Sequence, residues 1–290
     1  MNCVLSDAAL QSLLQEDCPC GDLTTEALAI GARQARLTFT ARAAMTVCGS
    51  EEAARLFELN RARAEIHVES GRTVDAGTLL LQAEGTAQQL HQTYKVAQTL
   101  MEMTSGIAGA ARAIAAAVRT QGFDIPIACT RKNFPGTKAL SIKAIKAGGA
   151  IVHRLGLSET LLLFAEHQIF LDTSPAATIR ALRARQAEKK IVVEVKDEAG
   201  ALLWARAGAD VLQLDKFSPA DLQACLQRII DAPGATRPVF AATGGIHAGN
   251  AAAYAAAGAD LLVTSAPYLA PPADVEVRFH PLPAGQGGPE

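Results

Sequence analysis

The pattern of apolar and polar residues changes at about residue 120. In the first part the apolar positions recur either with helical spacing or in the strict alternation of a half-buried strand. The helical stretches are 7–15 and 49–59, and the alternating ones are 35–42, 64–69 and 78–83. We therefore expect a small α+β domain at the start of the chain.

A longer helical pattern, rich in Ala, Leu and Met, runs over 87–119. Ser105 and Gly106 interrupt it, and a glycine within a helical pattern can mark its end. The sequence therefore predicts two helices separated at these residues.

After residue 120 short apolar runs recur, most of them preceded by a glycine and followed by polar residues. The six clear runs are 125–130, 150–153, 191–195, 211–215, 239–243 and 261–265, and 161–164 is a further candidate. The phrase Ala-Gly-Ala-Asp precedes two of them, at 207–210 and 257–260. Repeated units of helix, glycine and strand predict successive βαβ crossovers and a parallel sheet.

The predicted fold class is α/β, with the N-terminal α+β domain packed with an open, incomplete (β/α) barrel. A complete eightfold barrel usually needs about 250 residues, more than this part of the chain offers. A doubly wound sheet is the competing architecture. The expected domains are residues 1–106 and 107–270, and the alternating stretch 274–280 is expected to join the first domain as an edge strand.

Composition narrows the possible functions. The chain has 290 residues, 49% of them apolar, and a formal net charge of −2. These values exclude a disordered chain and argue against general nucleic-acid binding. With no run of 18 apolar residues and no readable secretory signal, we expect a cytoplasmic protein without a membrane partner. Six cysteines without CxxC spacing suggest reduced thiols, with a metal site at Cys18 and Cys20 as the alternative.

Positive charge gathers in one segment. Residues 129–154 contain six Lys or Arg and no Asp or Glu, which an anionic ligand would explain. Four basic residues of this segment follow predicted strands, whose carboxyl ends form the active-site edge of a parallel sheet. They are Arg131, Lys132, His153 and Arg154. Lys143 and Lys146 are expected on the solvated face of a helix, and for Lys138 both interpretations stay open.

Two tight turns predict a phosphate site. They follow the last two predicted strands of the repeat, so that backbone NH groups of both can face an anion. The expected phosphate-binding residues are Thr243, Gly244, Gly245, Thr264 and Ser265. Ordinary turns that lead into helices are the alternative.

Glu194 and Asp215 lie at the ends of neighbouring predicted strands, one βαβ repeat apart. Two carboxylates at one edge can share a Mg²⁺ ion with a polyphosphate substrate. Alternatively, each pairs with an adjacent lysine, Lys196 or Lys216. The chain has no P-loop, GxGxxG, GxSxG or HExxH motif, so an ATPase, a dinucleotide-dependent dehydrogenase and the common hydrolases lack their key residues.

Several motifs together resemble the quinolinate phosphoribosyltransferases, also called nicotinate-nucleotide pyrophosphorylases (carboxylating). They stand in the family's order between about residues 16 and 268. The motifs are CPCGDLTT (18–25), SGIA (105–108), TRK with PG (130–136), GG with HRLGL (148–157), EV (194–195), LD (214–215) and TGGI (243–246). The block from TRK to HRLGL is the most specific of them.

This resemblance implies an N-terminal α/β domain, an open α/β barrel and a homodimer in which a basic residue of one subunit completes the partner's site. It also implies transfer of phosphoribose from phosphoribosyl pyrophosphate, with Mg²⁺, to a ring nitrogen. In the typical enzyme loss of CO₂ follows, which is a step of NAD biosynthesis.

The resemblance also implies roles for individual residues. The four basic residues of the segment 129–154 named above match family residues that hold the acceptor carboxylates and the phosphates. Lys132, Glu194 and Asp215 are the expected catalytic residues, the two acids lying near the ribose and Mg²⁺. The turns at Gly244, Gly245 and Ser265 match the site of the 5′-phosphate.

Some family positions differ in this chain. The dimer-contributed arginine of the family corresponds to Lys95, which keeps the charge but loses the bidentate geometry of a guanidinium. One family lysine corresponds to Phe164, its neighbours to Ala165 and Glu166, and a second lysine to Ile142. We therefore expect an acceptor less acidic than quinolinate, or weak binding of quinolinate. The same pattern resembles the ModD branch of the family, which is associated with molybdenum transport.

Two other classes of protein stay open. The turn residues at 71–78 are similar to those of biotinyl or lipoyl carrier domains, but 64–93 contains no lysine to modify. A non-catalytic ligand-binding or regulatory protein of molybdenum uptake, built on the same scaffold, is the more serious alternative.

Overall fold

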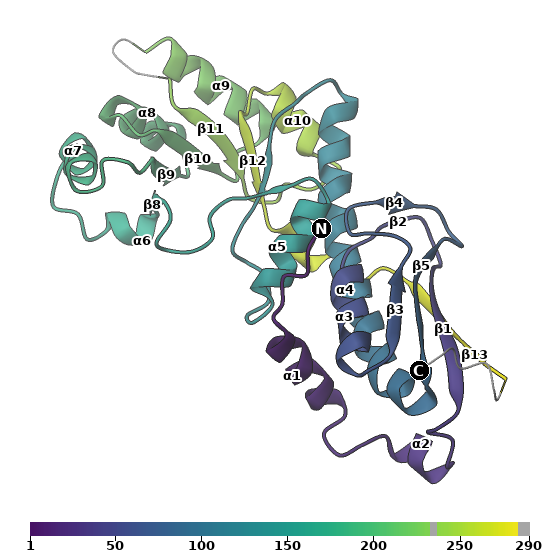
Figure 1. The fold of residues 1–290 in the computed structure, drawn as a ribbon. Helices are drawn as coiled ribbons and strands as arrows, with labels where there is room; N and C mark the ends of the chain where they lie inside the picture. The colour runs from purple at the N-terminus through teal and green to yellow at the C-terminus, as the bar shows by residue number, and fades with distance from the viewer. Residues whose placement is uncertain (233–236, 284–290) are drawn as a thin grey trace. The chain divides into compact units, whose positions relative to one another are not determined.

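The structure is a computed structural model that describes residues 1–232 and 237–283, and it separates into two compact units (Figure 1). The first unit contains Met1–Arg112, Phe134–Gly149 and the described residues from Pro267 on. The second contains Ala113–Asn133 and Ala150–Ala266. Each unit therefore draws on more than one stretch of the chain.

A four-stranded antiparallel sheet forms the frame of the first unit. Its order is β13-β1-β5-β3. The strands are β1 (Gln34–Ala41), β3 (Arg63–Ile66), β5 (Leu79–Thr86) and β13 (Val275–Pro281), and a separate antiparallel pair joins β2 (Met45–Thr46) to β4 (Thr73–Val74). The last strand of the chain pairs with β1 from Ala35 to Ala41, which makes it an edge strand of this sheet.

Helices in this part of the chain complete the core of the first unit. They are α1 (Asp7–Asp17), α2 (Leu23–Ala27), α3 (Ser50–Leu59), α4 (Ala87–Thr120) and α5 (Lys138–Ala147). The residues of α4 from Ala113 on belong to the second unit. The hydroxyl of Ser6 accepts a hydrogen bond from the backbone N of Ala9 and so begins α1. In the core, Phe39 of β1 packs edge to face on Phe57 of α3, with 5.9 Å between the ring centroids.

The helix break predicted at Ser105 and Gly106 is wrong, because α4 is one helix of 34 residues. The Ser105 hydroxyl accepts a hydrogen bond from the backbone N of Cys48 at 2.9 Å. A Cβ at position 106 would overlap the carbonyl oxygen of Pro271. The glycine is thus required by the close approach of another segment to the helix, and it does not end the helix.

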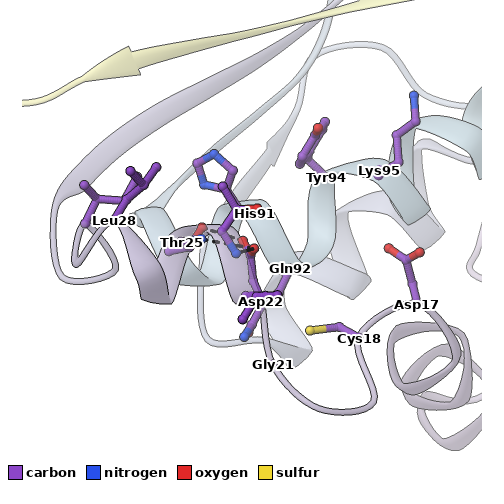
Figure 2. A pocket seen from close by; sticks show the side chains of 13 residues that line it. Asp17, Cys18, Gly21, Asp22, Thr25, Leu28, His91, Gln92, Tyr94 and Lys95 are labelled. Carbon is purple, nitrogen blue, oxygen red and sulfur yellow. Dashed lines mark hydrogen bonds between the residues drawn. The ribbon is translucent and has the colours of Figure 1, made fainter.

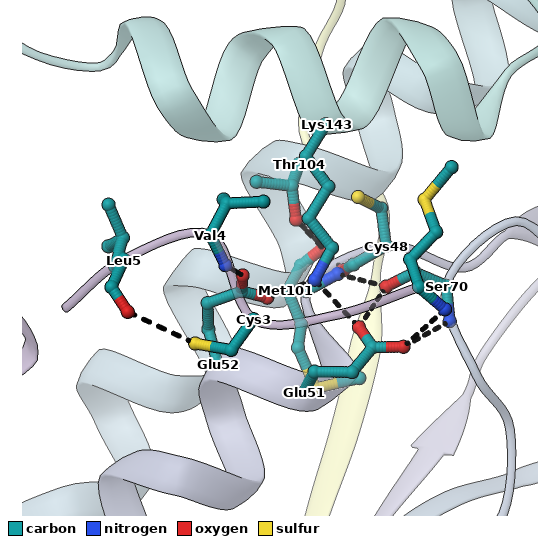
Figure 3. A network of polar contacts seen from close by, with 12 residues as sticks. Cys3, Val4, Leu5, Cys48, Glu51, Glu52, Ser70, Met101, Thr104 and Lys143 are labelled. Atoms are coloured by element: carbon teal, nitrogen blue, oxygen red, sulfur yellow. Dashed lines mark hydrogen bonds and ion pairs between the residues drawn. The ribbon is translucent and has the colours of Figure 1, made fainter. Parts of the chain in front are cut away.

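Lys143 on α5 is buried in the first unit, so the solvated position predicted for it is wrong (Figure 3). Its ammonium group contacts the carboxylates of Glu51 and Glu52 on α3 at 2.8 and 2.5 Å. Glu51 also accepts hydrogen bonds from Ser70, and Glu52 accepts one from the backbone N of Val4. The helical pattern around Lys143 could not reveal these partners, since they lie more than ninety positions earlier in the chain.

The second unit is built on a seven-stranded parallel sheet of order β7-β6-β12-β11-β10-β9-β8. The strands are β6 (Ile127–Cys129), β7 (Ile151–Val152), β8 (Leu161–Leu163), β9 (Ile191–Val195), β10 (Val211–Asp215), β11 (Val239–Thr243) and β12 (Leu261–Thr264). The strands from β8 to β12 lie side by side in chain order, and β12 is followed by β6 and then β7. Closing the sheet between β7 and β8 would therefore give a barrel with all strands in chain order, so the sheet is an opened barrel. In a doubly wound sheet the order of the strands would instead reverse at the centre of the sheet. The α/β class with an open barrel is therefore confirmed.

Helices connect these strands and extend the chain beyond them. They are α6 (Ala165–Gln168), α7 (Pro175–Arg185), α8 (Glu198–Ala207), α9 (Pro219–Ile230), α10 (Ala251–Ala256) and the 3₁₀ helix η1 (Ala266–Leu269). Within the described residues, none of the helices has the length and apolarity that crossing a membrane requires.

One face of the parallel sheet carries a small apolar cluster. Its buried members are Ala128, Leu162, Val192, Val211, Ala241 and Val263. Side chains alternate between the faces of a strand, so residues two or four positions beyond Val192 and Val211 lie on this same face. Those residues are Glu194, Gln213 and Asp215. The apolar interior is therefore followed by a polar layer nearer the carboxyl ends of β9 and β10.

Candidate functional site

The parallel order of the second unit brings the carboxyl ends of its seven strands to one edge of the sheet. Most of the predicted site residues lie in or directly after these strand ends. They are Arg131, Lys132, His153, Arg154, Glu194, Asp215, Thr243, Gly244, Gly245, Thr264 and Ser265. Lys95 belongs to the first unit.

Glu194 and Asp215 are close enough for their charges to interact. Burial raises the pKa of Glu194, a hydrogen bond from Gln213 lowers it, and the charge of Asp215 raises it further. In the described part of the second unit, the ion pairs use other carboxylates. Neither Lys196 nor Lys216 forms an ion pair with these two acids among the described residues, but the charge of Lys196 lowers the pKa of Glu194, so the alternative of pairing with an adjacent lysine stays open.

This acid pair offers carboxylate oxygens, which are ligands that Mg²⁺ prefers. Two neighbouring carboxylates repel one another, and a divalent cation between them relieves that repulsion. Among the described residues no group of three or more His, Cys, Asp and Glu could hold a metal ion. A pair of carboxylates matches Mg²⁺, which commonly binds one or two carboxylates and keeps several waters.

Arg154 is a buried cation at the same sheet edge. Its residue is 5% exposed, and its guanidinium lies over the Phe164 ring at 5.5 Å from the centroid. No described carboxylate forms an ion pair with it. Burial and the nearby charge of Arg131 lower the pKa of Arg154. The pKa of His153 is also lowered, mainly by burial and to a smaller extent by the charge of Arg154. A positive charge with so little exposure and no carboxylate partner among the described residues favours an anionic ligand.

The backbone around the end of β6 is held on both sides. The backbone N of Thr130 donates to the carbonyl of Thr264 at 2.9 Å, and that of His153 donates to Cys129 at 2.9 Å. The Thr130 hydroxyl accepts a hydrogen bond from the backbone N of Lys132. These bonds fix where the exposed Lys132 leaves the sheet.

The turn after β11 passes directly beside Asp215. Gly244 and Gly245 have φ angles of +89° and +76°, which residues other than glycine rarely adopt. A Cβ on Gly244 would lie 2.9 Å from a carboxylate oxygen of Asp215. Asn250 donates a hydrogen bond to the carbonyl of Gly245 at 2.9 Å. Gly244 therefore has no room for a side chain, and the hydrogen bond from Asn250 holds the backbone of the turn in place.

Thr264 links this turn to the end of β12. Its buried hydroxyl donates to the carbonyl of Ile246 at 2.7 Å and accepts a hydrogen bond from the backbone N of Ala266 at 3.0 Å. Ser265 beside it is half-buried. The structure therefore gives the Thr264 hydroxyl two partners within the protein, and phosphate binding by Thr264 and Ser265 stays a prediction.

Lys95 lies on α4, exposed, and lines a cavity of about 490 Å³ in the first unit (Figure 2). Its ammonium group donates to the side chain of Gln98 at 3.1 Å. The cavity is also lined by Cys18, Gly21 and Asp22 of the CPCGDLTT motif. The role of Lys95 in the site of a partner subunit stays a prediction.

Gln213 contacts Glu194, a predicted site residue, and the sequence analysis missed it. Its side chain donates a hydrogen bond of 2.7 Å to the Glu194 carboxylate. The signal was available, because Gln213 precedes Asp215 by two positions within an otherwise apolar run. Period-two alternation places both side chains on one face.

Comparisons with known proteins agree on one family. Family models for the N-terminal and C-terminal domains of quinolinate phosphoribosyl transferase match residues 22–105 and 107–278. A protein of Rhodobacter capsulatus named "Putative pyrophosphorylase ModD" is 49% identical over 250 residues, covering 86% of this chain and 95% of that protein. The nicotinate-nucleotide pyrophosphorylase (carboxylating) of Mycobacterium leprae is 31% identical over 271 residues, covering 90% and 93%.

A solved structure shows the same fold. The nicotinate-nucleotide pyrophosphorylase from Francisella tularensis matches with a TM-score of 0.86 over 95% of this chain and 98% of that chain. The two sequences are 19% identical, so this likeness concerns the fold alone.

Proposed function

Because the chain belongs to the quinolinate phosphoribosyl transferase family, we propose that it transfers phosphoribose from phosphoribosyl pyrophosphate to the ring nitrogen of a heterocyclic carboxylic acid. The name of the Rhodobacter relative, "Putative pyrophosphorylase ModD", supports this class of reaction. The observation that carries the proposal is the charge arrangement in the second unit. Two interacting carboxylates lie near the carboxyl ends of β9 and β10, and a buried arginine without a carboxylate partner among the described residues follows β7 of the same parallel sheet.

The acid pair suits the charges that such a reaction develops. Departure of pyrophosphate leaves positive charge on the ribose and builds negative charge on the leaving group. Carboxylates of Glu194 and Asp215 beside the ribose stabilise the first charge, and they are also the residues that would hold Mg²⁺. When bound there, Mg²⁺ supplies positive charge to the pyrophosphate oxygens. Lys132 adds a further cation, and no covalent nucleophile is required.

The basic residues suit the acceptor. Arg154 and Arg131 offer positive charge to an acceptor carboxylate, and His153, whose pKa is lowered, offers a hydrogen-bond donor. The ring that lies against the Arg154 guanidinium belongs to Phe164, where the family has a lysine. With fewer cations at the acceptor, we propose a substrate less acidic than quinolinate.

The remaining predicted residues complete the proposed site. The Gly244-Gly245 turn, with Thr243, Thr264 and Ser265 near it, would bind the 5′-phosphate through backbone NH groups and hydroxyls. Lys95 would enter the site of the partner subunit in a homodimer. A lysine there supplies charge without the paired hydrogen bonds of an arginine.

Release of pyrophosphate tests the proposal. The protein is incubated with phosphoribosyl pyrophosphate, Mg²⁺ and a panel of pyridine, pyrimidine and pterin-like carboxylic acids that includes quinolinate. We expect release with at least one acid, and faster release with it than with quinolinate. Turnover of quinolinate as efficient as that of an established family enzyme would refute the altered acceptor site.

Calorimetry separates this enzyme from a molybdenum-binding regulator. Binding of phosphoribosyl pyrophosphate that depends on Mg²⁺, and that is lost in the double variant Glu194→Gln, Asp215→Asn, supports the enzyme. Molybdate binding that the same two changes leave intact supports the regulator.

A further inference from the structure

Gln213 is a polar side chain within an apolar part of the sheet. The residue is 4% exposed and lies on the face that also carries Val192, Val211 and Ala241. An apolar side chain of similar size would fill this position without burying an amide. The presence of glutamine is therefore not explained by packing.

The hydrogen bonds of Gln213 are asymmetric. Its amide nitrogen donates to Oε2 of Glu194 at 2.7 Å, whereas its amide oxygen is buried and has no hydrogen-bond partner among the described residues. The reverse orientation would place the amide oxygen against a carboxylate oxygen at the same distance, and two acceptors repel. The side chain of Gln213 is thus directed at Glu194 alone.

The strand register leads to the same result. Gln213 on β10 pairs in register with Glu194 on β9 and with Ala241 on β11. Ala241 offers no polar side-chain atom. Of its two strand neighbours, only Glu194 can therefore bond to the amide, and Glu194 is held by a group that cannot move far within a packed sheet.

We propose that Gln213 is a positioning residue that holds the Glu194 carboxylate beside Asp215. This inference rests on the proposed function, in which these two carboxylates hold Mg²⁺ and face the ribose. A carboxylate that is already oriented need not reorganise when the cation and sugar arrive. The buried amide oxygen is unfavourable for stability, and functional sites are where such unfavourable groups are retained.

The variant Gln213→Met tests the inference. Methionine has nearly the same length and volume but cannot donate to Glu194. Calorimetric titration with phosphoribosyl pyrophosphate, with and without Mg²⁺, compares the dissociation constants of the variant and the wild type. We expect the constant with Mg²⁺ to rise about tenfold or more, as for other residues that orient metal ligands. The constant without Mg²⁺ should stay unchanged, and the melting temperature should not fall.

Gln168→Met is the matched control. Gln168 also donates a hydrogen bond to Glu194, but to its backbone oxygen, at 3.4 Å. This variant loses a glutamine bond to the same residue and leaves the carboxylate alone. We expect its dissociation constants for phosphoribosyl pyrophosphate, with and without Mg²⁺, to match those of the wild type.

A second variant exchanges the two groups. Glu194→Gln combined with Gln213→Glu retains one amide and one carboxylate in contact, so the pair can still form and the protein should fold. The carboxylate has moved from β9 to β10, however, and we expect the Mg²⁺-dependent part of the binding to be lost. If the exchanged pair binds phosphoribosyl pyrophosphate as tightly as the wild type, the position of the carboxylate is unimportant and the inference is wrong.

The outcomes separate the inference from the proposed function. If the wild type does not bind phosphoribosyl pyrophosphate in the presence of Mg²⁺, both are refuted. If the wild type binds and Gln213→Met binds equally well, the function stands and only the positioning role is refuted. If Gln213→Met loses binding equally with and without Mg²⁺ and melts at a lower temperature, Gln213 is structural and the inference is again refuted.

Discussion

Lys216 has a left-handed backbone conformation, with φ of +60°, directly after Asp215. Such a conformation costs a residue with a Cβ about 1–2 kcal/mol, whereas asparagine adopts it readily. The turn lets the backbone N of Lys216 donate to the carbonyl of Thr243 at 2.8 Å, which continues the pairing of β10 and β11 past Asp215. Strain therefore lies where the acid pair meets the glycine turn.

Replacing Lys216 with asparagine should relieve this strain. We expect Lys216→Asn to raise the free energy of unfolding by about 0.5–1 kcal/mol, measured by urea denaturation. Lys196→Asn removes the same charge after the neighbouring strand and should change the free energy by less than about 0.5 kcal/mol. A destabilised Lys216→Asn would show that the lysine side chain contributes more to the fold than its backbone conformation costs.

At the scale of elements, one buried ion cluster joins α5 to α3. Lys143→Met would leave the carboxylates of Glu51 and Glu52 buried without their cation. We expect a loss of about 3–5 kcal/mol in the free energy of unfolding. Lys146→Met is the control, since Lys146 is exposed on the same helix and its loss should change stability by less than about 0.5 kcal/mol. Equal effects of the two variants would contradict this account of the cluster.

The same cluster makes the free energy of unfolding depend on pH in the acidic range. Burial favours a higher pKa for Glu51, but hydrogen bonds from Lys143 and Ser70 lower it to about 2, from an ordinary value of 4.5. Because the pKa is lower in the folded state, the stabilisation is present above pH 4.5 and is lost as the pH falls toward 2. The difference in unfolding free energy between Lys143→Met and the wild type should therefore shrink below about pH 4.

Two glycines of α4 offer a matched test of helix packing. Alanine at position 106 would overlap Pro271, so Gly106→Ala should destabilise the protein by about 1–3 kcal/mol. Nothing lies within 4 Å of a Cβ at position 109, so Gly109→Ala should stabilise it by about 0.5–1 kcal/mol. Thermal unfolding of both variants measures the contrast. Similar effects would mean that position 106 is not closely packed in solution.

At the scale of the whole molecule, the predicted site residues are divided between the two units. The strand ends with Glu194 belong to the second unit, and Lys95 belongs to the first. If Lys95 acts in the partner subunit of a homodimer, each active site combines residues of two chains. Symmetric dimers allow this to be tested by mixing.

Mixing two inactive variants should restore activity. In a dimer of Lys95→Ala with Glu194→Gln, one site has both changes and the other has neither. Random exchange of subunits makes half of the dimers mixed, so about a quarter of wild-type pyrophosphate release should return. Each variant incubated alone is the control. A mixture as inactive as its components would place Lys95 in the site of its own subunit, and activity of Lys95→Ala alone would place it outside any site.

Much of the second unit could be predicted from local pattern. The runs 191–195, 211–215 and 239–243 coincide with β9, β10 and β11, because a strand buried on both faces leaves a short apolar run in the sequence. The polar residues that follow such runs come to one edge of the sheet for the same reason. The positions of Glu194 and Asp215 at that edge were therefore predictable.

Other features depend on residues far apart in the chain. Neither the continuity of α4 nor the burial of Lys143 could be inferred, because the groups responsible, Pro271 and the two glutamates of α3, are distant in sequence. The bond from Gln213 to Glu194 likewise depends on the register of two strands.

Fold class, parallel strands and the kinds of residue at the strand ends could be inferred from the order of residues alone, since period and composition are local properties. Which charges have partners became apparent only from the folded chain. Among the described residues, Lys143 forms ion pairs with two carboxylates, whereas Arg154 and the acid pair form none, and this distinction separates a structural ion cluster from a candidate site. The physical reason is that the energy of a charge depends on its burial and its neighbours in space, which the order of residues does not contain.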